Sequence, residues 1–151
     1  MSSDLPKRAE MLDQLLQEIR EFIAGVVLFN QKAAESLGIN LTDCQCLNIL
    51  QMTGAIPAGR LAELTGLTTG AITGVIDRLE KARFVQRMRD PSDRRLVIIQ
   101  PIPDRQAEID RVYAAPSHAT TKLLESYSDQ ELAIVLNFFT QATTLRSPKS
   151  Q

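Results

Sequence analysis

Apolar residues recur at three- and four-residue steps through most of this chain, the spacing that places them on one face of an α-helix. The longest such run extends from Leu12 to Leu37 and predicts one amphipathic helix over about residues 8–36, which Gly38 ends. This apolar face is longer than one small domain usually covers. We therefore interpret the segment as either a long core helix or a helix between subunits.

Shorter helical patterns follow in the middle of the chain, separated by glycine and proline. The predicted helices run from Leu41 to Gly54 with Thr42 as the N-cap, from Ala58 to about Thr65 with Pro57 in the first turn, and to about Ala82 from a cap at Thr68. The last two are joined by a tight turn at Gly66. Two short helices joined in this way are typical of a helix-turn-helix.

The pattern then changes to that of a β-hairpin. Residues 84–89 and 96–99 resemble strands, and the loop between them, residues 90–95, contains Pro91 and other turn-forming residues. A hairpin directly after a helix-turn-helix is a wing. The sequence therefore predicts a winged helix-turn-helix.

Helical spacing returns near Asp104 and continues to the end of the chain. Pro116 interrupts the first of these segments and predicts a kink or a break. Ser128 and Glu131 form a capping box that begins the last helix, and we expect residues 147–151 to be frayed. The predicted fold class is mainly α with a small β-hairpin.

Charge changes the picture only when it is divided along the chain. The 151 residues carry a net charge of −1, yet residues 57–100 hold eight basic and five acidic side chains, a net charge of +3. The remaining residues have a net charge of −4. Positive charge is thus concentrated in the predicted winged domain, as expected of a nucleic-acid-binding segment.

Secretion and membrane insertion are not indicated. No apolar segment follows Lys7 and Arg8 at the N-terminus, and the apolar run at residues 26–29 is far too short to span a bilayer. Two cysteines do not make a disulfide framework. We expect a cytoplasmic protein without a membrane partner.

The helix that Thr68 caps presents small polar residues at its N-terminal end. Thr69 and Thr73 alternate there with Gly70 and Gly74, so no long side chain holds this end away from a groove floor. Threonine hydroxyls can bond base edges or phosphates, and the helix N-terminus favours anions. Ordinary capping chemistry explains the same residues taken alone.

The loop of the hairpin carries the stronger indication. Arg94 and Arg95 are adjacent at its tip, and Arg87 and Arg89 lie on the strand before it. Guanidinium groups on a protruding hairpin suit the narrow minor groove, and Asp93 could hold one of them in place through a bidentate pair. The alternative is a solvated turn with incidental ion pairs.

These segments together resemble the MarR family of transcriptional regulators. The resemblance rests on residues 60–67 (RLAELTGL), 75–81 (VIDRLEK) and 90–95 (DPSDRR) and extends over essentially the whole chain. It implies a homodimer on a pseudo-palindromic double-stranded DNA operator. It also implies dimerisation through residues 1–37 and 103–151, with residues 38–102 as the DNA-binding domain.

The resemblance further implies that the helix at residues 68–82 reads the major groove and that the wing at residues 85–99 enters the minor groove. Arg95 is then the groove-inserting residue, oriented by Asp93. The candidate DNA-binding residues are Thr68, Thr69, Thr73, Arg78, Lys81, Arg87, Arg89, Arg94 and Arg95. A ligand-responsive repressor controlled by a small aromatic or phenolic effector is implied as well, with no effector site that the sequence identifies.

The chain departs from the family at several places. Gly74 stands where the family often has a basic or larger polar residue, so base readout by a long side chain is missing there. A Lys-Gly-aromatic link into the wing is replaced by residues 81–84 (KARF), so we expect the helix to end differently. Prolines 101 and 103 replace the usual entry into the next helix and predict a stiffer hinge.

Other chemistry finds little support in the sequence. Cys44 is the candidate for a redox-responsive thiol because we expect it to be more exposed than Cys46, which lies on the apolar face. His118 has no partners at metal-ligand spacing and no nucleophile to activate. We predict neither an enzyme nor a cofactor. A thiol-based redox regulator and a protein-interaction module that has lost DNA binding remain as alternatives.

Overall fold

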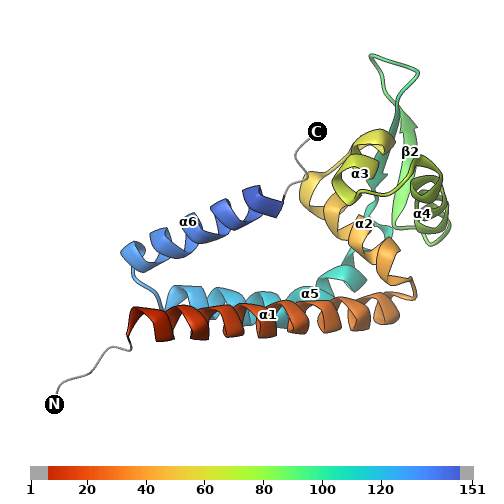
Figure 1. The fold of residues 1–151 in the computed structure, drawn as a ribbon. Helices are drawn as coiled ribbons and strands as arrows, with labels where there is room; N and C mark the ends of the chain where they lie inside the picture. Colours follow the sequence, from red (N-terminus) through yellow and green to blue (C-terminus); the bar gives the residue numbers. More distant parts are fainter. Residues whose placement is uncertain (1–6, 147–151) are drawn as a thin grey trace. The chain divides into compact units, whose positions relative to one another are not determined.

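The structure is a computed structural model that describes residues 7–146, so the predicted fraying of residues 147–151 lies outside the described residues. It is mainly helical with a small antiparallel sheet, which confirms the predicted class (Figure 1). The helices are α1 (Arg8–Leu37), α2 (Leu41–Thr53), α3 (Ala58–Thr65), α4 (Thr69–Lys81), α5 (Gln106–Glu125) and α6 (Asp129–Arg146). The strands are β1 (Ile56–Pro57), β2 (Val85–Arg89) and β3 (Val97–Pro101), and a 3-10 turn, η1, covers Pro103–Arg105.

Local capping explains where α1 ends and α2 begins. Gly38 adopts the left-handed conformation (φ 71°) that ends α1, as predicted. The predicted N-cap of α2 was wrong. The side chain of Asn40 accepts the backbone N–H of Asp43 at 2.8 Å, and Thr42 lies inside the first turn. Asparagine is among the strongest N-cap residues, and from two positions before Thr42 its side chain satisfies the orphan N–H group of Asp43.

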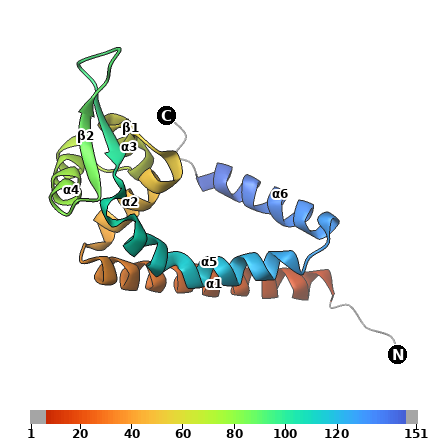
Figure 2. The same ribbon diagram turned by 180° about the vertical axis from the view of Figure 1, so that it is seen from behind.

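The sheet contains a strand that the sequence did not predict. The strand order is β1–β3–β2 (Figure 2). Ile56 of β1 lies opposite Ile99 of β3, and Arg87 of β2 lies opposite the same residue from the other side. Strand β1 has only two residues, too few to show an alternating pattern. Pro57 has no N–H to donate, which suits an edge strand, and it is the N-cap of α3 rather than a first-turn residue.

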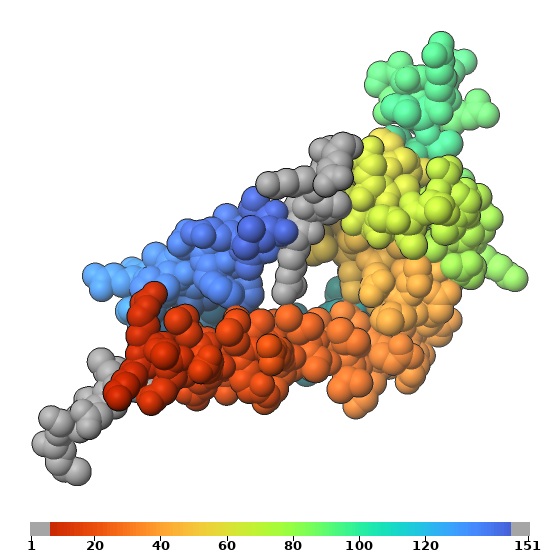
Figure 3. Space-filling model, viewed as in Figure 1, coloured from red at the N-terminus to blue at the C-terminus, as the bar shows by residue number. Residues whose placement is uncertain are grey.

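The core of the winged domain lies between α2, α3, α4 and the sheet. The predicted apolar stripe of α4 is confirmed, since Ile72, Val75, Ile76 and Leu79 are all at most 2% exposed. Each such side chain stabilises the fold by about 1.5–3 kcal/mol on burial. The α4 helix is therefore fixed by its apolar side, and its polar side faces outward. The β2–β3 hairpin projects from this body as the wing (Figures 1 and 3).

Helix α4 ends in a left-handed residue although no glycine is present. Arg83 has φ 62°, the N–H of Phe84 bonds the carbonyl of Leu79 at 3.0 Å, and the N–H of Arg83 bonds that of Glu80 at 3.0 Å. This pair of bonds is a Schellman motif. The prediction that the missing glycine changes the helix end was wrong, because the motif and its buried Phe84 hold Arg83 in a conformation that costs a non-glycine residue about 1–2 kcal/mol.

The C-terminal helices differ from the prediction at one point. The prediction at Pro116 was a kink or a break; helix α5 continues through Pro116, so the break does not occur. The predicted capping box is confirmed: the N–H of Ser128 bonds Glu131 Oε2 at 2.8 Å, and the N–H of Glu131 bonds Ser128 Oγ at 3.3 Å. The chain divides between Val112 and Tyr113 into two compact units.

Candidate nucleic-acid interface

The N-terminal end of α4 presents threonine hydroxyl groups to solvent. Thr68 Oγ1 accepts the backbone N–H of Ala71 at 3.2 Å, which confirms Thr68 as the N-cap. Thr69 and Thr73 are exposed, and Thr73 donates its hydroxyl hydrogen to the carbonyl of Thr69 at 3.0 Å. Thr73 Oγ1 thereby keeps lone pairs that face outward. This end of α4 combines an accessible polar edge with the positive end of the helix dipole.

Arg78 is anchored to α2 by a carboxylate that is almost fully buried. Its Nε donates to Asp43 Oδ2 at 2.8 Å and its Nη2 donates to Oδ1 at 2.7 Å. Asp43 is 2% exposed, whereas the Arg78 side chain is 52% exposed. The bond to Asp43 is the main cause that raises the pKa of the Arg78 guanidinium. One edge of the guanidinium is thus fixed to the core side of the domain.

Arg87 ties the wing to the other flank of α4. Its guanidinium forms ion pairs with Asp77 and, at 3.3 Å, with Glu80 Oε1, while its backbone N–H donates to Glu80 Oε2 at 2.9 Å. The same contacts, with Asp77 first, raise the pKa of Arg87. The geometry gives this candidate residue a bracing role between β2 and α4. Salt bridges therefore connect α4 to two neighbouring elements. Arg78 of α4 pairs with Asp43 of α2, and Arg87 of β2 pairs with Asp77 and Glu80 of α4.

The tip of the wing exposes the remaining candidate arginines. Arg89, Arg94 and Arg95 are exposed, and within residues 7–146 none of them pairs with a carboxylate. Lys81, at the end of α4, is likewise exposed. Basic groups without acidic partners retain their full attraction for phosphate or for a groove of negative potential.

Carboxylates shape the loop that carries these arginines. Asp90 Oδ1 accepts the N–H of Ser92 at 2.7 Å, its hydroxyl at 2.7 Å, and the N–H of Asp93 at 2.9 Å. The predicted bidentate pair between Asp93 and an arginine does not form. Asp93 Oδ1 accepts the backbone N–H of Arg95 at 3.0 Å instead. A carboxylate two residues before an N–H group closes a local turn more readily than it reaches a mobile guanidinium, so Asp93 orients the backbone of Arg95.

The cysteines are poor candidates for a reactive site. The prediction that Cys44 is more exposed than Cys46 is wrong, because both side chains are 0% exposed. Helix α2 packs against α1, α3, α4 and β3, so its buried surface includes Cys44. The apolar spacing of the sequence did not reveal this burial. Burial, followed by the nearby Asp43, raises the pKa of Cys46 to about 11 against a smaller opposite effect of Arg78. The Cys46 thiol is therefore protonated at neutral pH and acts as a small apolar side chain.

Metal and membrane chemistry receive no support from the described part of the chain. No group of three or more His, Cys, Asp or Glu side chains in it could hold a metal ion. His118 is exposed on α5. None of the helices described is both long enough and apolar enough to cross a membrane.

Comparison with known proteins identifies the family. The MarR family model matches residues 39–97, which span α2, α3, α4 and most of the wing. The HTH-type transcriptional regulator YcgE of Bacillus subtilis (strain 168), described as uncharacterized, is 37% identical over 138 residues, which cover 91% of this chain and 90% of that protein. The chain belongs to the MarR family.

Other MarR relatives and solved structures agree with this assignment. The HTH-type transcriptional regulator MhqR of Bacillus subtilis (strain 168) is 29% identical over 97 residues, 57% of this chain and 67% of that protein. A MarR family protein from Bacillus stearothermophilus has the same fold, with a TM-score of 0.68 at 20% identity over 91% of this chain and 96% of that one. As a MarR-family member, the chain is a DNA-binding transcriptional regulator of the winged helix-turn-helix type and not an enzyme.

Sequence reasoning found the basic residues of this surface but missed their partners. Asp43 is 35 positions from Arg78 and Asp77 is 10 positions from Arg87. Neither separation matches a helical or hairpin repeat, so no local pattern could pair these residues. Asp43, the one charged residue of α2, near its start, was the one available signal.

Proposed function

We propose that this regulator is a homodimeric repressor that binds a pseudo-palindromic operator and releases it when a small aromatic or phenolic effector binds. The observation that supports DNA contact most directly is the exposure of Arg94 and Arg95 at the wing tip, without carboxylate partners among residues 7–146, on a hairpin whose strand β2 is tied to α4 by Arg87. Basic groups placed to either side of a recognition helix are the electrostatic footprint of a duplex-binding protein.

In this proposal, α4 enters the major groove with its N-terminal end. Thr68, Thr69 and Thr73 contact base edges or phosphates there, and Lys81 contacts the phosphate backbone. The wing lies along the adjacent minor groove, where Arg95 inserts and where Arg89 and Arg94 contact phosphates. Arg87 contributes mainly by fixing the angle between the wing and α4, since Asp77 and Glu80 occupy its guanidinium.

Exposed apolar side chains on α1 and α6 support a dimer. We propose dimerisation through residues 1–37 and 103–151, with residues 38–102 as the DNA-binding domain. Helices α1 and α6 carry large apolar residues that are at least 38% exposed. A soluble monomer rarely leaves so much apolar surface uncovered. They are Met11, Leu12, Leu15, Leu16, Phe22, Ile23, Val26, Val27 and Leu28 on α1, and Ile134, Leu136, Phe138, Phe139 and Leu145 on α6.

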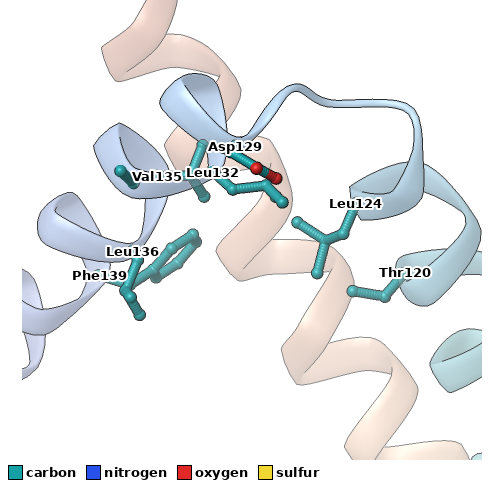
Figure 4. A pocket seen from close by; sticks show the side chains of 8 residues that line it. Thr120, Leu124, Asp129, Leu132, Val135, Leu136 and Phe139 are labelled. Carbon is teal, nitrogen blue, oxygen red and sulfur yellow. The ribbon is translucent and has the colours of Figure 1, made fainter.

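An apolar cavity within the C-terminal unit supports the same arrangement. Its volume is about 610 Å³, and its walls come from α5 and α6 (Figure 4). Leu124 faces Leu132 and Phe139 across the cavity, and Leu136 and Phe139 are also part of the exposed apolar face of α6. We propose that side chains of a second copy pack into it. A twofold dimer that binds two half-sites one turn of B-DNA apart must present its two α4 helices about 34–36 Å apart.

The test of the proposal is a mobility-shift titration with DNA from upstream of the protein's own coding region. Wild type is expected to bind as a dimer, measured by light scattering of the complex, and affinity should fall steeply as salt concentration rises because counterions are released. Arg95→Ala should weaken binding at least tenfold, about 1.4 kcal/mol, and leave the dimer intact. Arg60→Ala is the matched control, because Arg60 is exposed but lies outside the wing in an ion pair with Glu63.

Two outcomes would overturn parts of this proposal. Equal affinities of wild type and Arg95→Ala would exclude the wing contact. Absence of binding to any member of a random DNA library would favour the protein-interaction module instead.

The effector is tested with a panel of aromatic acids and phenols, one of which should dissociate the complex. The redox alternative loses its support, because Cys44 is buried.

A further inference from the structure

The guanidinium of Arg78 is only partly occupied by its buried partner. A guanidinium carries five N–H groups, one on Nε and two on each terminal nitrogen. Asp43 accepts one from Nε and one from Nη2. Three N–H groups are left, two on Nη1 and one on Nη2, and the Arg78 side chain is 52% exposed. The edge formed by Nη1 and Nη2 is therefore available to a ligand, while Asp43 fixes the plane of the group.

Gly74 provides the space in which this edge lies. A Cβ atom added at Gly74 would come within 3.3 Å of Arg78 Nη1, closer than most real Cβ contacts. Side chains on a helix lean toward its N-terminus, and Arg78 accordingly lies back over the turn that contains Gly74. That turn also carries the exposed Thr73. Gly70, one turn earlier, has nothing within 4 Å of its Cβ position, so the constraint is specific to Gly74.

We propose that Arg78, held by Asp43 over Gly74, reads a guanine in the major groove through its Nη1 and Nη2 edge. The inference rests on the proposed function, in which α4 enters that groove. Guanine is the base that offers two adjacent acceptors, N7 and O6, to a bidentate donor. The sequence indicated that Gly74 leaves the chain without a long reading side chain. Arg78 supplies one from the following turn.

Charge favours a base over a phosphate as the ligand. Arg78 and Asp43 together are neutral, and so is the neighbouring pair of Asp77 with Arg87, so this part of α4 has no net positive charge. A neutral pair attracts phosphate weakly but keeps its directional N–H donors. Asp43 is thus a positioning residue, and Arg78 is the residue that determines specificity.

The first experiment replaces guanine with 7-deazaguanine, which lacks the N7 acceptor. Wild type first selects a motif from a random DNA library, and each guanine in it is then replaced in turn. At one position in each half-site, we expect the replacement to weaken wild-type binding roughly 5- to 150-fold, the range for a bidentate base contact. Arg78→Gln combined with Asp43→Asn, which leaves no unpaired buried charge, should bind both DNAs equally. If every replacement affects the wild type and this double variant alike, the proposal is wrong.

The second experiment uses two glycines as a matched pair. Gly74→Ala should displace the guanidinium and reduce the discrimination against 7-deazaguanine, whereas Gly70→Ala should preserve that discrimination ratio. Alanine favours a helix over glycine, so both variants are expected to fold. Equal discrimination by Gly74→Ala and wild type would overturn the role of Gly74.

Salt dependence separates base reading from phosphate contact. Removing Arg78 with Asp43, as in the double variant, should leave the slope of log affinity against log salt unchanged, while Arg94→Ala, which removes a proposed phosphate contact, should reduce it by about 1. A reduced slope in the double variant would show that Arg78 binds phosphate and would contradict the proposal. If the wild type selects no DNA at all, the proposed function itself fails, which is a different result.

Discussion

The guanidinium carbon of Arg105 lies 4.2 Å from the centroid of the buried Phe84 ring. From this position Arg105 donates to the carbonyl of Leu37 at 3.2 Å, to that of Ala82 at 3.3 Å and to both oxygens of Glu108. One side chain therefore connects the end of α1, the link between α4 and the wing, and the start of α5. Because the wing follows Phe84 directly, this contact helps to fix where the wing begins.

We predict that Arg105→Ala lowers the free energy of unfolding by about 2 kcal/mol, the sum expected for a partly buried cation–π contact and hydrogen bonds from a charged group. Urea denaturation at a fixed protein concentration measures this change. Arg105→Lys is the matched control, because it keeps the charge but not the planar group that stacks and branches. The free energy of unfolding of Arg105→Lys should lie between those of wild type and Arg105→Ala. Wild-type stability in both variants would show that the contact contributes nothing.

A second prediction concerns the left-handed residue at the end of α4. Arg83→Gly removes the steric cost of φ 62° and should raise the free energy of unfolding by up to about 1 kcal/mol. Arg83→Ala, which keeps the strain but removes the exposed ion pair with Asp104, should change it by less than about 0.5 kcal/mol. Thermal unfolding distinguishes the two variants. If glycine and alanine give the same result, the backbone of Arg83 is not strained.

A third prediction concerns pH and the loop of the wing. Hydrogen bonds from the Ser92 hydroxyl, then from the N–H groups of Asp93 and Ser92, lower the pKa of Asp90 below its ordinary value. A lowered carboxylate pKa means that the turn is fully stabilised above about pH 4 and loses this stabilisation as pH falls further. The protection factors for amide hydrogen exchange of Ser92 and Asp93, each taken against the intrinsic rate at the same pH, should fall over that range in wild type.

Variants of Asp90 separate the charge from the hydrogen bonds. Asp90→Asn keeps an acceptor oxygen, so its loop should be insensitive to pH. Asp90→Ala loses the acceptor and should weaken operator binding roughly 3- to 10-fold, because Arg94 and Arg95 are no longer preorganised. Unchanged affinity in Asp90→Ala would show that the turn does not position these arginines.

A fourth prediction concerns the thiols. Since Cys44 and Cys46 are buried, and the pKa of Cys46 is raised to about 11, neither should react with iodoacetamide at pH 7.5 in the folded protein. Both should react at once in 6 M guanidinium chloride. Mass spectrometry of the alkylated protein counts the modified residues. Rapid labelling of Cys44 under native conditions would revive the redox alternative.

Apolar periodicity, helix-capping residues and turn-forming residues in the sequence were enough to predict the order of the helices and the hairpin in the winged domain. The apolar stripe of α4 repeats at helical spacing, Gly38 and Thr68 mark helix ends, and the hairpin follows from its turn-forming loop. These features depend on neighbours within about four residues. Strand β1 escaped prediction because two residues carry no period, and Asn40 because several adjacent polar residues can cap a helix equally well in sequence terms.

The sequence by itself determined which residues could meet DNA: a helix that begins in threonines, and a loop tipped with Arg94 and Arg95. Only the tertiary structure decided which charged groups are already engaged. It joined Arg78 to Asp43 and Arg87 to Asp77, buried Cys44, and placed the guanidinium of Arg78 over Gly74. The physical reason is that the packing of α2, β2 and α4 brings together charges that are distant in the chain, and an ion pair depends on distance in space rather than on spacing in sequence.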